Sequence, residues 1–275
     1  MPLRRPAAPS GWTKALPAGE RAVCPAPSRP GQMQCMSIIR TTPRGQAAGA
    51  AVRILGYGPS DLRSAYKIAL AAARSGRGRT IAIVDAFSDP RAASDLAAYR
   101  AHYHLGSCTK ANGCLRIVNE HGRTGPLPAA NRNWAAEESL DLDMVSAICP
   151  KCRILLVEAH TASASDLAIA EDTAVAKGAR YVSNSRSGNE FLGQDVFNHF
   201  FNHPGVAIDF ASGNFGYGPA YPTDLQYVTA VGAPPCSVAA PDAAGPRPCG
   251  ARAPRAARRG PVPAARRWRP SRPGS

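Results

Sequence analysis

Four carboxylates fall within seven consecutive residues of one amphipathic stretch, NWAAEESLDLDMVSAICP, at positions 133–150. Glu137 and Asp141 are spaced i,i+4, and like charges at this spacing destabilise an isolated helix by about a few tenths of a kcal/mol. On a helical wheel both lie inside the apolar arc, about 40° apart. Carboxylates that face a core must be paired, protonated or hydrogen-bonded. The pattern predicts either a solvated first helical turn or a coupled acid pair that shares a proton.

The other two carboxylates of this stretch, and Asp85 upstream of it, are expected to be solvent-exposed or structural rather than catalytic. Glu138 and Asp143 lie at the margins of the apolar arc, which predicts surface positions for both. Asp85 ends an apolar run, and we expect a structural hydrogen bond there rather than direct chemistry.

Short apolar runs alternate with helical patterns through the middle of the chain. The runs predict strands at 80–86, 154–158, 181–183, 206–210 and 227–231. Helical patterns occur at 59–74, 90–102, 135–148, 164–177 and 193–202. This alternation predicts an α/β fold with a parallel sheet that helices cover on both faces. Active sites in such folds lie at the carboxyl ends of the strands.

Composition divides the chain into three parts. Residues 1–47 are rich in Pro, Arg, Ala and Gly and are expected to be irregular, residues 48–232 form the folded domain, and residues 233–275 show neither strand nor helix periodicity. The net charge is +14; the last part holds nine arginines and one acid, which gives it +8 and leaves +6 for the rest. We expect this tail to be disordered or misplaced, because it has too little apolar surface to offset the entropy of ordering.

Six of the eight cysteines form close pairs in the sequence: Cys24/Cys35, Cys108/Cys114 and Cys149/Cys152. Such pairs are typical of disulfides in an oxidising compartment. Cys149-Pro-Lys-Cys152 also matches a redox or zinc half-site, but no second CxxC or nearby His accompanies it, which favours a local disulfide. The first residues lack the apolar stretch of a signal peptide, and no apolar run approaches the roughly 20 residues of a membrane span.

Several segments in order resemble the sedolisin family of serine-carboxyl peptidases, which have a subtilisin-like fold. They are GYGPSDLRSAYKI, TIAIVDAFSDPRAASDLAAYR, CTKANGC, AAEESLDLDMVSAICPKCRILLVEA, RYVSNS, FNHPGVAI and YVTAVG. The resemblance covers about residues 48–232, and a fainter similarity at 21–40 matches the stretch upstream of the mature domain, a possible prosegment remnant. It implies an acid-acting serine endopeptidase that is secreted and cleaves protein or peptide substrates.

The resemblance also implies roles for four residues. Glu137 would be the base that takes the serine proton, and Asp141 would orient it through a short hydrogen bond. Asn214 stands where the family has the Asp of the oxyanion site, and an amide there donates at any pH; a simple turn residue is the alternative. Arg186 replaces a Trp of the substrate pocket and would select acidic side chains.

The family's nucleophile is missing, because the chain contains no Gly-Thr-Ser triplet. At the matching position it has Gly-Ala-Pro-Pro-Cys, residues 232–236. Deleting one G from a GC-rich coding of Gly-Gly-Thr-Ser-Leu produces this sequence, so we hypothesise that residues from Ala233 onward are translated out of frame. A truncated, inactive member of the family is the resulting prediction. The acids of the family's calcium site are also missing after Gly232, so no calcium, other metal or cofactor is expected.

Two other functions remain open. The domain could be a non-catalytic module that holds peptides in its cleft without cutting them. The arginine-rich tail could bind nucleic acid through phosphate contacts, but the out-of-frame hypothesis explains its composition more simply. We therefore expect a protein or peptide partner, no nucleic acid, no membrane and no oligomer.

Overall fold

A six-stranded sheet forms the centre of the computed structural model, which describes residues 16, 18–41, 57–214 and 220–232. The strand order is β10-β9-β7-β4-β6-β5, and every neighbouring pair is parallel. The strands are β4 (Thr80–Ala86), β5 (Leu115–Asn119), β6 (Arg153–Ala159), β7 (Tyr181–Asn184), β9 (Ala207–Ala211) and β10 (Thr229–Val231). All five predicted apolar runs are strands of this sheet, which confirms the α/β class. The predicted incompleteness of the fold beyond residue 232 lies outside the described residues.

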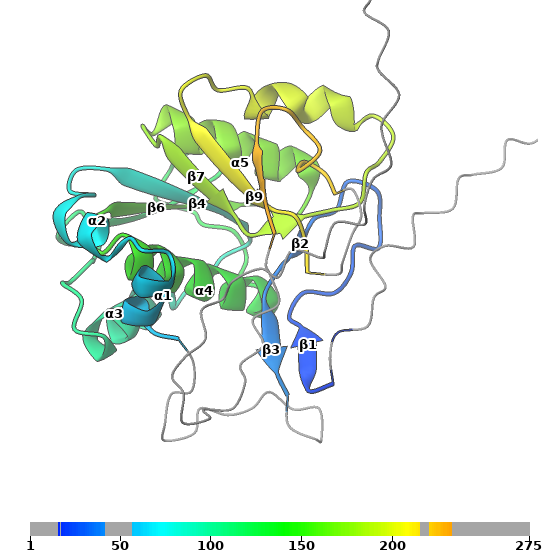
Figure 1. Ribbon diagram of the computed structural model, residues 1–275. Coiled ribbons are helices and arrows are strands. Elements are labelled where there is room, and N and C mark those ends of the chain that lie inside the picture. Colours follow the sequence, from blue (N-terminus) through cyan, green and yellow to red (C-terminus); the bar gives the residue numbers. More distant parts are fainter. Residues whose placement is uncertain (1–15, 17, 42–56, 215–219, 233–275) are drawn as a thin grey trace, which may run out of the picture. The chain divides into compact units, whose positions relative to one another are not determined.

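Helices cover both faces of the sheet (Figure 1). One face carries α1 (Pro59–Ala65), α3 (Ala92–His102) and α4 (Arg132–Ile148), and the other carries α5 (Ala164–Ala176) and the 3-10 helix η2 (Gln194–Phe201). The side chains of β4 alternate between them: Ile83 packs in the cluster that contains Leu96 and Leu142, whereas Val84 packs in the cluster that contains Leu167. Burial on both faces explains why β4 is a continuous apolar run.

Two predicted helices differ in detail from the structure. The pattern at 59–74 forms two short helices, α1 and α2 (Ala69–Arg74), because Lys67 between them has a φ of 55° in the left-handed region. A non-glycine residue in that conformation interrupts the α-helical hydrogen-bond ladder. The pattern at 193–202 forms η2, a 3-10 helix. In the described part of the chain, no helix is long and apolar enough to cross a membrane.

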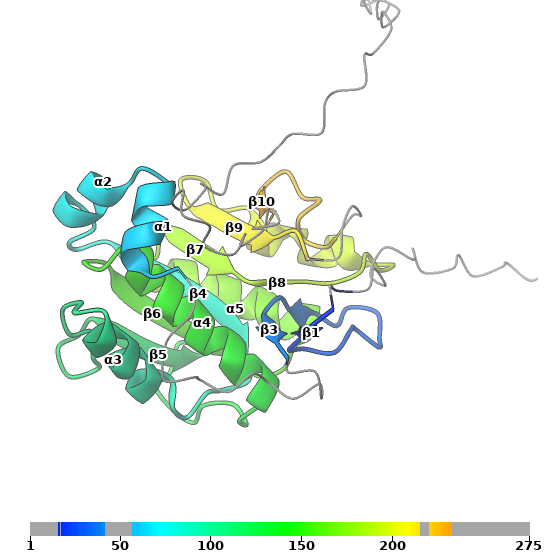
Figure 2. The same cartoon turned by 60° about the horizontal axis from the view of Figure 1, so that its bottom comes forward.

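Short strands interrupt the N-terminal segment that was expected to be irregular. β1 (Glu20–Ala22) pairs antiparallel with β3 (Ile38–Arg40), and β2 (Gln34–Cys35) pairs antiparallel with β8 (Arg186–Ser187). Figures 1 and 2 show the blue strands β1 and β3 near one end of α4. The segment therefore lies against the part of the domain that contains the candidate acids.

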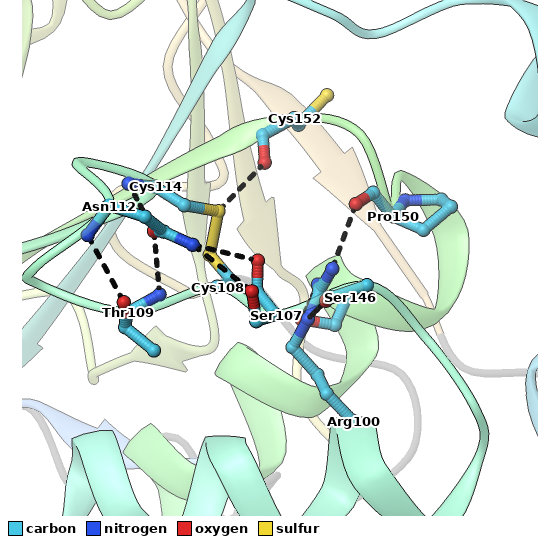
Figure 3. Close-up of a disulfide and its surroundings, with 10 residues drawn as sticks. Arg100, Ser107, Cys108, Thr109, Asn112, Cys114, Ser146, Pro150 and Cys152 are labelled. Carbon is cyan, nitrogen blue, oxygen red and sulfur yellow. Dashed lines mark hydrogen bonds between the residues drawn. A yellow bond between two sulfur atoms is a disulfide. The ribbon is translucent and has the colours of Figure 1, made fainter.

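All three predicted cysteine pairs are disulfides in the structure, Cys24–Cys35, Cys108–Cys114 and Cys149–Cys152. The second closes the loop between α3 and β5, where the Asn112 side chain bonds back to Ser107 and Thr109 (Figure 3). Beside this loop, the Arg100 guanidinium donates to Ser146 Oγ and the Pro150 carbonyl, each at 2.9 Å, which joins α3 to the end of α4. The disulfides are compatible with an oxidising compartment.

Gly76 lies against the third disulfide, and this contact gives a testable stability difference. A Cβ at Gly76, whose φ is +90°, would overlap Cys149 Sγ and lie 3.1 Å from Cys152 Sγ. Gly78 has a similar φ of +77°, but a Cβ added there would meet nothing within 4 Å, so it is a matched control. We expect Gly78→Ala to cost roughly 1–2 kcal/mol of unfolding free energy for the left-handed backbone, and Gly76→Ala roughly 1–3 kcal/mol more for overpacking. Urea unfolding measures both, and equal losses would contradict the expectation.

Candidate active site

Helix α4 places Glu137 and Asp141 on a buried face. Asn131 begins the helix by accepting hydrogen bonds from the backbone N–H groups of Asn133 and Trp134, which satisfies two of the free donors of its first turn. Glu137 is 1% exposed and Asp141 7% exposed. The alternative of a solvated first turn is therefore wrong, and the inward-facing acid pair is what the structure contains.

Each of the two acids accepts a hydrogen bond from a group outside α4. Glu137 Oε2 accepts from the backbone N–H of Ser37 at 2.5 Å, and Asp141 Oδ1 accepts from Ser185 Oγ at 2.7 Å. Among the described residues no hydrogen bond joins the two carboxyl groups directly, although the resemblance implies one. Burial raises the pKa of Glu137 above its ordinary value. Burial, followed by the charges of Asp85 and Glu137, raises the pKa of Asp141 well above its ordinary value.

Asp85 completes a group of three acids at the carboxyl end of β4. It is fully buried, and neither carboxyl oxygen has a hydrogen-bond partner among the described residues. The predicted structural hydrogen bond of Asp85 is therefore wrong. Burial raises the pKa of Asp85 well above its usual range, and the Glu137 charge raises it further. Because each ionised member of the group raises the pKa of its neighbours, the site favours protonated carboxyl groups.

The surface positions predicted for the other two acids of α4 need correction. Glu138 is fully buried; its Oε2 accepts from the Asp89 backbone N–H at 3.1 Å, and its Oε1 has no partner among the described residues. Burial, and then the charges of Asp85 and Glu158, raise the pKa of Glu138 to about 11. Asp143 is only half-buried, and burial raises its pKa to about 7. Glu138 therefore extends the acid group rather than facing solvent.

Asn214 and Glu137 contact opposite sides of the peptide group between Met36 and Ser37. It follows β9 by three residues, and its Nδ2 donates to the carbonyl oxygen of Met36. The next N–H along the chain, that of Ser37, donates to Glu137. An amide donor and a carboxyl acceptor thus contact the two ends of the Met36–Ser37 peptide group. The sequence did not identify Met36, Ser37 or Ser185 as site residues. Each contacts a partner that lies 44 to 178 positions away in the chain, and no local pattern links residues so far apart.

The structure gives Arg186 partners within the protein. Its side chain is 1% exposed, its Nη2 lies 3.2 Å from Glu171 Oε2 and 2.9 Å from Asn184 Oδ1, and its guanidinium lies 4.9 Å from the centre of the Phe210 ring. Burial lowers the pKa of this guanidinium, although the Glu171 charge opposes that shift. The predicted contact between Arg186 and acidic substrate side chains finds no support in this arrangement.

No group of three or more His, Cys, Asp and Glu side chains in the described residues is arranged to hold a metal ion. Glu137 and Glu138 accept hydrogen bonds from backbone N–H groups, and Asp141 accepts one from the Ser185 hydroxyl. The predicted absence of a calcium site concerns residues after Gly232, which lie outside the described residues.

Comparison with solved structures relates the fold to that of a known enzyme. The structure is similar to Pseudomonas sedolisin, a serine-carboxyl proteinase solved in complex with two molecules of pseudo-iodotyrostatin, with a TM-score of 0.50 and 18% sequence identity. The match covers 65% of this chain and 54% of that chain, so this chain spans about half the length of that enzyme. No protein-family model and no curated protein sequence matches the chain. The likeness shows that the chain has a subtilisin-like α/β fold.

Proposed function

We propose that the site is of the serine-carboxyl peptidase type and that this chain uses it to hold a peptide bond without cleaving it. The observation that supports the proposal is the position of Glu137 and Asn214 at opposite ends of one peptide group. In an acyl-transfer enzyme, a base must lie beside the nucleophile and the leaving amine, and an amide donor must face the carbonyl oxygen. Glu137 and Asn214 match these two roles, and Asp141 is the buried neighbour that would orient the base.

The missing component is the nucleophile. No Gly-Thr-Ser triplet occurs in the sequence, and loss of the nucleophile removes covalent catalysis even where the rest of a triad is intact. Ser185 is hydrogen-bonded to Asp141 rather than to Glu137, so it does not replace the missing serine beside the base. The non-catalytic peptide-binding module is therefore part of the same proposal. Secretion is proposed with it, on the strength of the three disulfides.

A digestion assay tests the absence of cleavage. We expect purified full-length protein to release no fragments from an acid-denatured protein substrate between about pH 3 and pH 6, where a carboxylate base would operate. Glu137→Gln tests the base, and Glu190→Gln, at an exposed position, is the matched control. Mass spectrometry of the products measures the result. Fragments that form with the wild-type and Glu190→Gln proteins but not with Glu137→Gln would show an active peptidase and refute the proposal.

A further inference from the structure

The amino ends of three neighbouring strands carry exposed arginines. Arg79 precedes β4, Arg153 begins β6 and Arg180 precedes β7, and these strands are adjacent in the sheet. The strand register places the three arginines within one residue of the same level, and the Arg153 N–H donates to the Arg79 carbonyl at 2.8 Å. Neighbouring strands lie about 4.8 Å apart. The backbone therefore holds three cations in a row along this edge of the sheet.

Helix α2 and the loops beside it add further cations to this row. Arg74 ends α2, Arg77 lies in the loop that follows, and Lys151 Nζ donates to the carbonyl of Ala73 at the end of α2. Figures 1 and 2 show α2 at the end of the sheet opposite β1 and β3. We call this surface the basic face, and its exposed cations are Arg74, Arg77, Arg79, Lys151, Arg153 and Arg180.

No acid neutralises the basic face. The stretches that build it contain no Asp or Glu at 62–84, 144–157 or 173–189. The structure shows no ion pair between any of the six cations and another residue of the described ranges. The buried acids Asp85 and Glu158 lie instead near the carboxyl ends of β4 and β6. An unneutralised group of cations on one face attracts an anionic partner.

The favourable effect of cations at helix ends does not account for this group. A helix C-terminus stabilises a nearby positive charge, but of the six cations only Arg74 lies in the last turn of a helix. The last turns of α4 and α5 contain no basic residue. Five of the six cations therefore have no structural partner that explains them.

Helix α2 places apolar side chains beside these cations. Five of its six residues are apolar, and only Ala72 is buried. Leu70 is 61% exposed, and Tyr66, which caps the end of α1, is 69% exposed. Lys67 and Arg74 border the apolar stretch between them. An exposed apolar helix bordered by cations is typical of an element that lies in the interface of an anionic membrane.

An anionic lipid surface fits both observations, whereas two other partners fit only one. A second copy that used the same face would bring like charges together. A soluble polyanion such as a nucleic acid would contact the arginines through its phosphates, but it would give the Leu70 side chain no apolar partner. The expectation of no membrane partner rested on the lack of a spanning segment, which a surface contact does not need.

We propose that the basic face and α2 form a docking surface for an anionic lipid membrane. The guanidinium groups contact lipid phosphates, and the Leu70 and Tyr66 side chains enter the headgroup region. Glu137 and Asn214 lie towards the carboxyl ends of the strands, so the docked protein turns the candidate active site away from the lipid. The inference does not depend on the proposed function of that site.

Sedimentation of the full-length protein with vesicles tests the role of the cations. The vesicles are phosphatidylcholine with about 30 mol% phosphatidylglycerol. Arg77→Gln/Arg79→Gln removes two charges of the basic face, and Arg29→Gln/Arg132→Gln removes two exposed charges outside it and is the charge-matched control. We expect the first variant to bind these vesicles at least about tenfold more weakly than the control. Equal binding of the two folded variants would overturn the inference.

A tryptophan reporter tests whether α2 enters the lipid. Leu70→Trp places an indole on α2, and Leu192→Trp, at a fully exposed position outside the basic face, is the matched control. Vesicles should shift the emission of Leu70→Trp to shorter wavelength and brominated lipid should quench it, while neither changes the emission of Leu192→Trp. Circular dichroism identifies the variants that retain the fold. Heparin binding with no change in the emission of Leu70→Trp on vesicles would show a soluble polyanion as the partner and overturn the membrane inference.

Discussion

Glu138→Gln will stabilise the protein by roughly 3 kcal/mol at pH 7 and by almost nothing at pH 4. The folded protein keeps the Glu138 proton, because burial and then the charges of Asp85 and Glu158 raise its pKa to about 11. The unfolded chain releases that proton near the ordinary glutamate pKa of 4.5. A raised folded pKa gives stability that is complete below pH 4.5 and is lost as the pH rises. Glutamine has nearly the same shape and no proton to lose, so it removes this loss.

Urea unfolding at pH 4 and pH 7 measures the effect. The matched control is Asp95→Asn, which breaks an exposed i,i+4 ion pair of 3.0 Å with Arg91 and should change the unfolding free energy by less than about 1 kcal/mol at either pH. If Glu138→Gln changes stability equally at both pH values, Glu138 does not hold its proton in the folded protein.

The other buried carboxyl groups predict how the stability of the wild-type protein depends on pH. Burial raises the pKa of Asp85 and Asp141 well above their ordinary values, and it raises the pKa of Glu158 and of Glu171 to about 7. All four shifts have the same sign as that of Glu138, so wild-type stability should be highest in mild acid and should fall as the pH rises through 7.

The sequence could predict the inward pair because helical periodicity is local. Glu137 and Asp141 fall inside the apolar arc of α4, and burial follows from that position. The predicted surface position of Glu138 was wrong because a helical wheel assumes that only one face of the helix is buried. α4 packs on β4 and also on α1 and α3, and the loop at Asp89 covers Glu138. A residue at the margin of the arc is buried when several elements surround a helix.

The fold was predictable for a similar reason, and its exceptions have physical causes. Runs such as 80–86 and 154–158 are apolar because both faces of their strands are covered. β5 was missed because it is an edge strand whose sequence, LRIVN, includes the exposed Arg116. The contact between Ser37 and Glu137 joins residues 100 positions apart, and no periodicity within either segment contains that information.

Removing the buried cation at position 186 will cause a large loss of unfolding free energy. Arg186→Met leaves Glu171 without its ion-pair partner inside the core, and breaking a buried pair in this way typically costs about 3–5 kcal/mol. The loss should be larger at pH 8 than at pH 5. Burial raises the pKa of Glu171, and the charge of Arg186 lowers it by less. Together the two effects place the pKa of Glu171 at about 7. Glu171 is therefore protonated in acid and needs no partner, whereas at pH 8 the variant must bury a charge or hold a proton that the unfolded chain releases.

The double variant Arg186→Met/Glu171→Gln separates this structural role from a role in substrate contact. Replacing both members of a buried pair by neutral groups of similar volume is often nearly neutral, so the double variant should recover most of the loss in urea unfolding. Arg116→Met, at an exposed position on β5, is the control and should change the unfolding free energy by less than about 0.5 kcal/mol. If Arg186→Met leaves stability unchanged and instead alters which peptides bind, Arg186 faces the ligand and the buried ion pair is not its role. Because the guanidinium contacts Glu171, Asn184 and the Phe210 ring, we expect stability rather than peptide selection to respond.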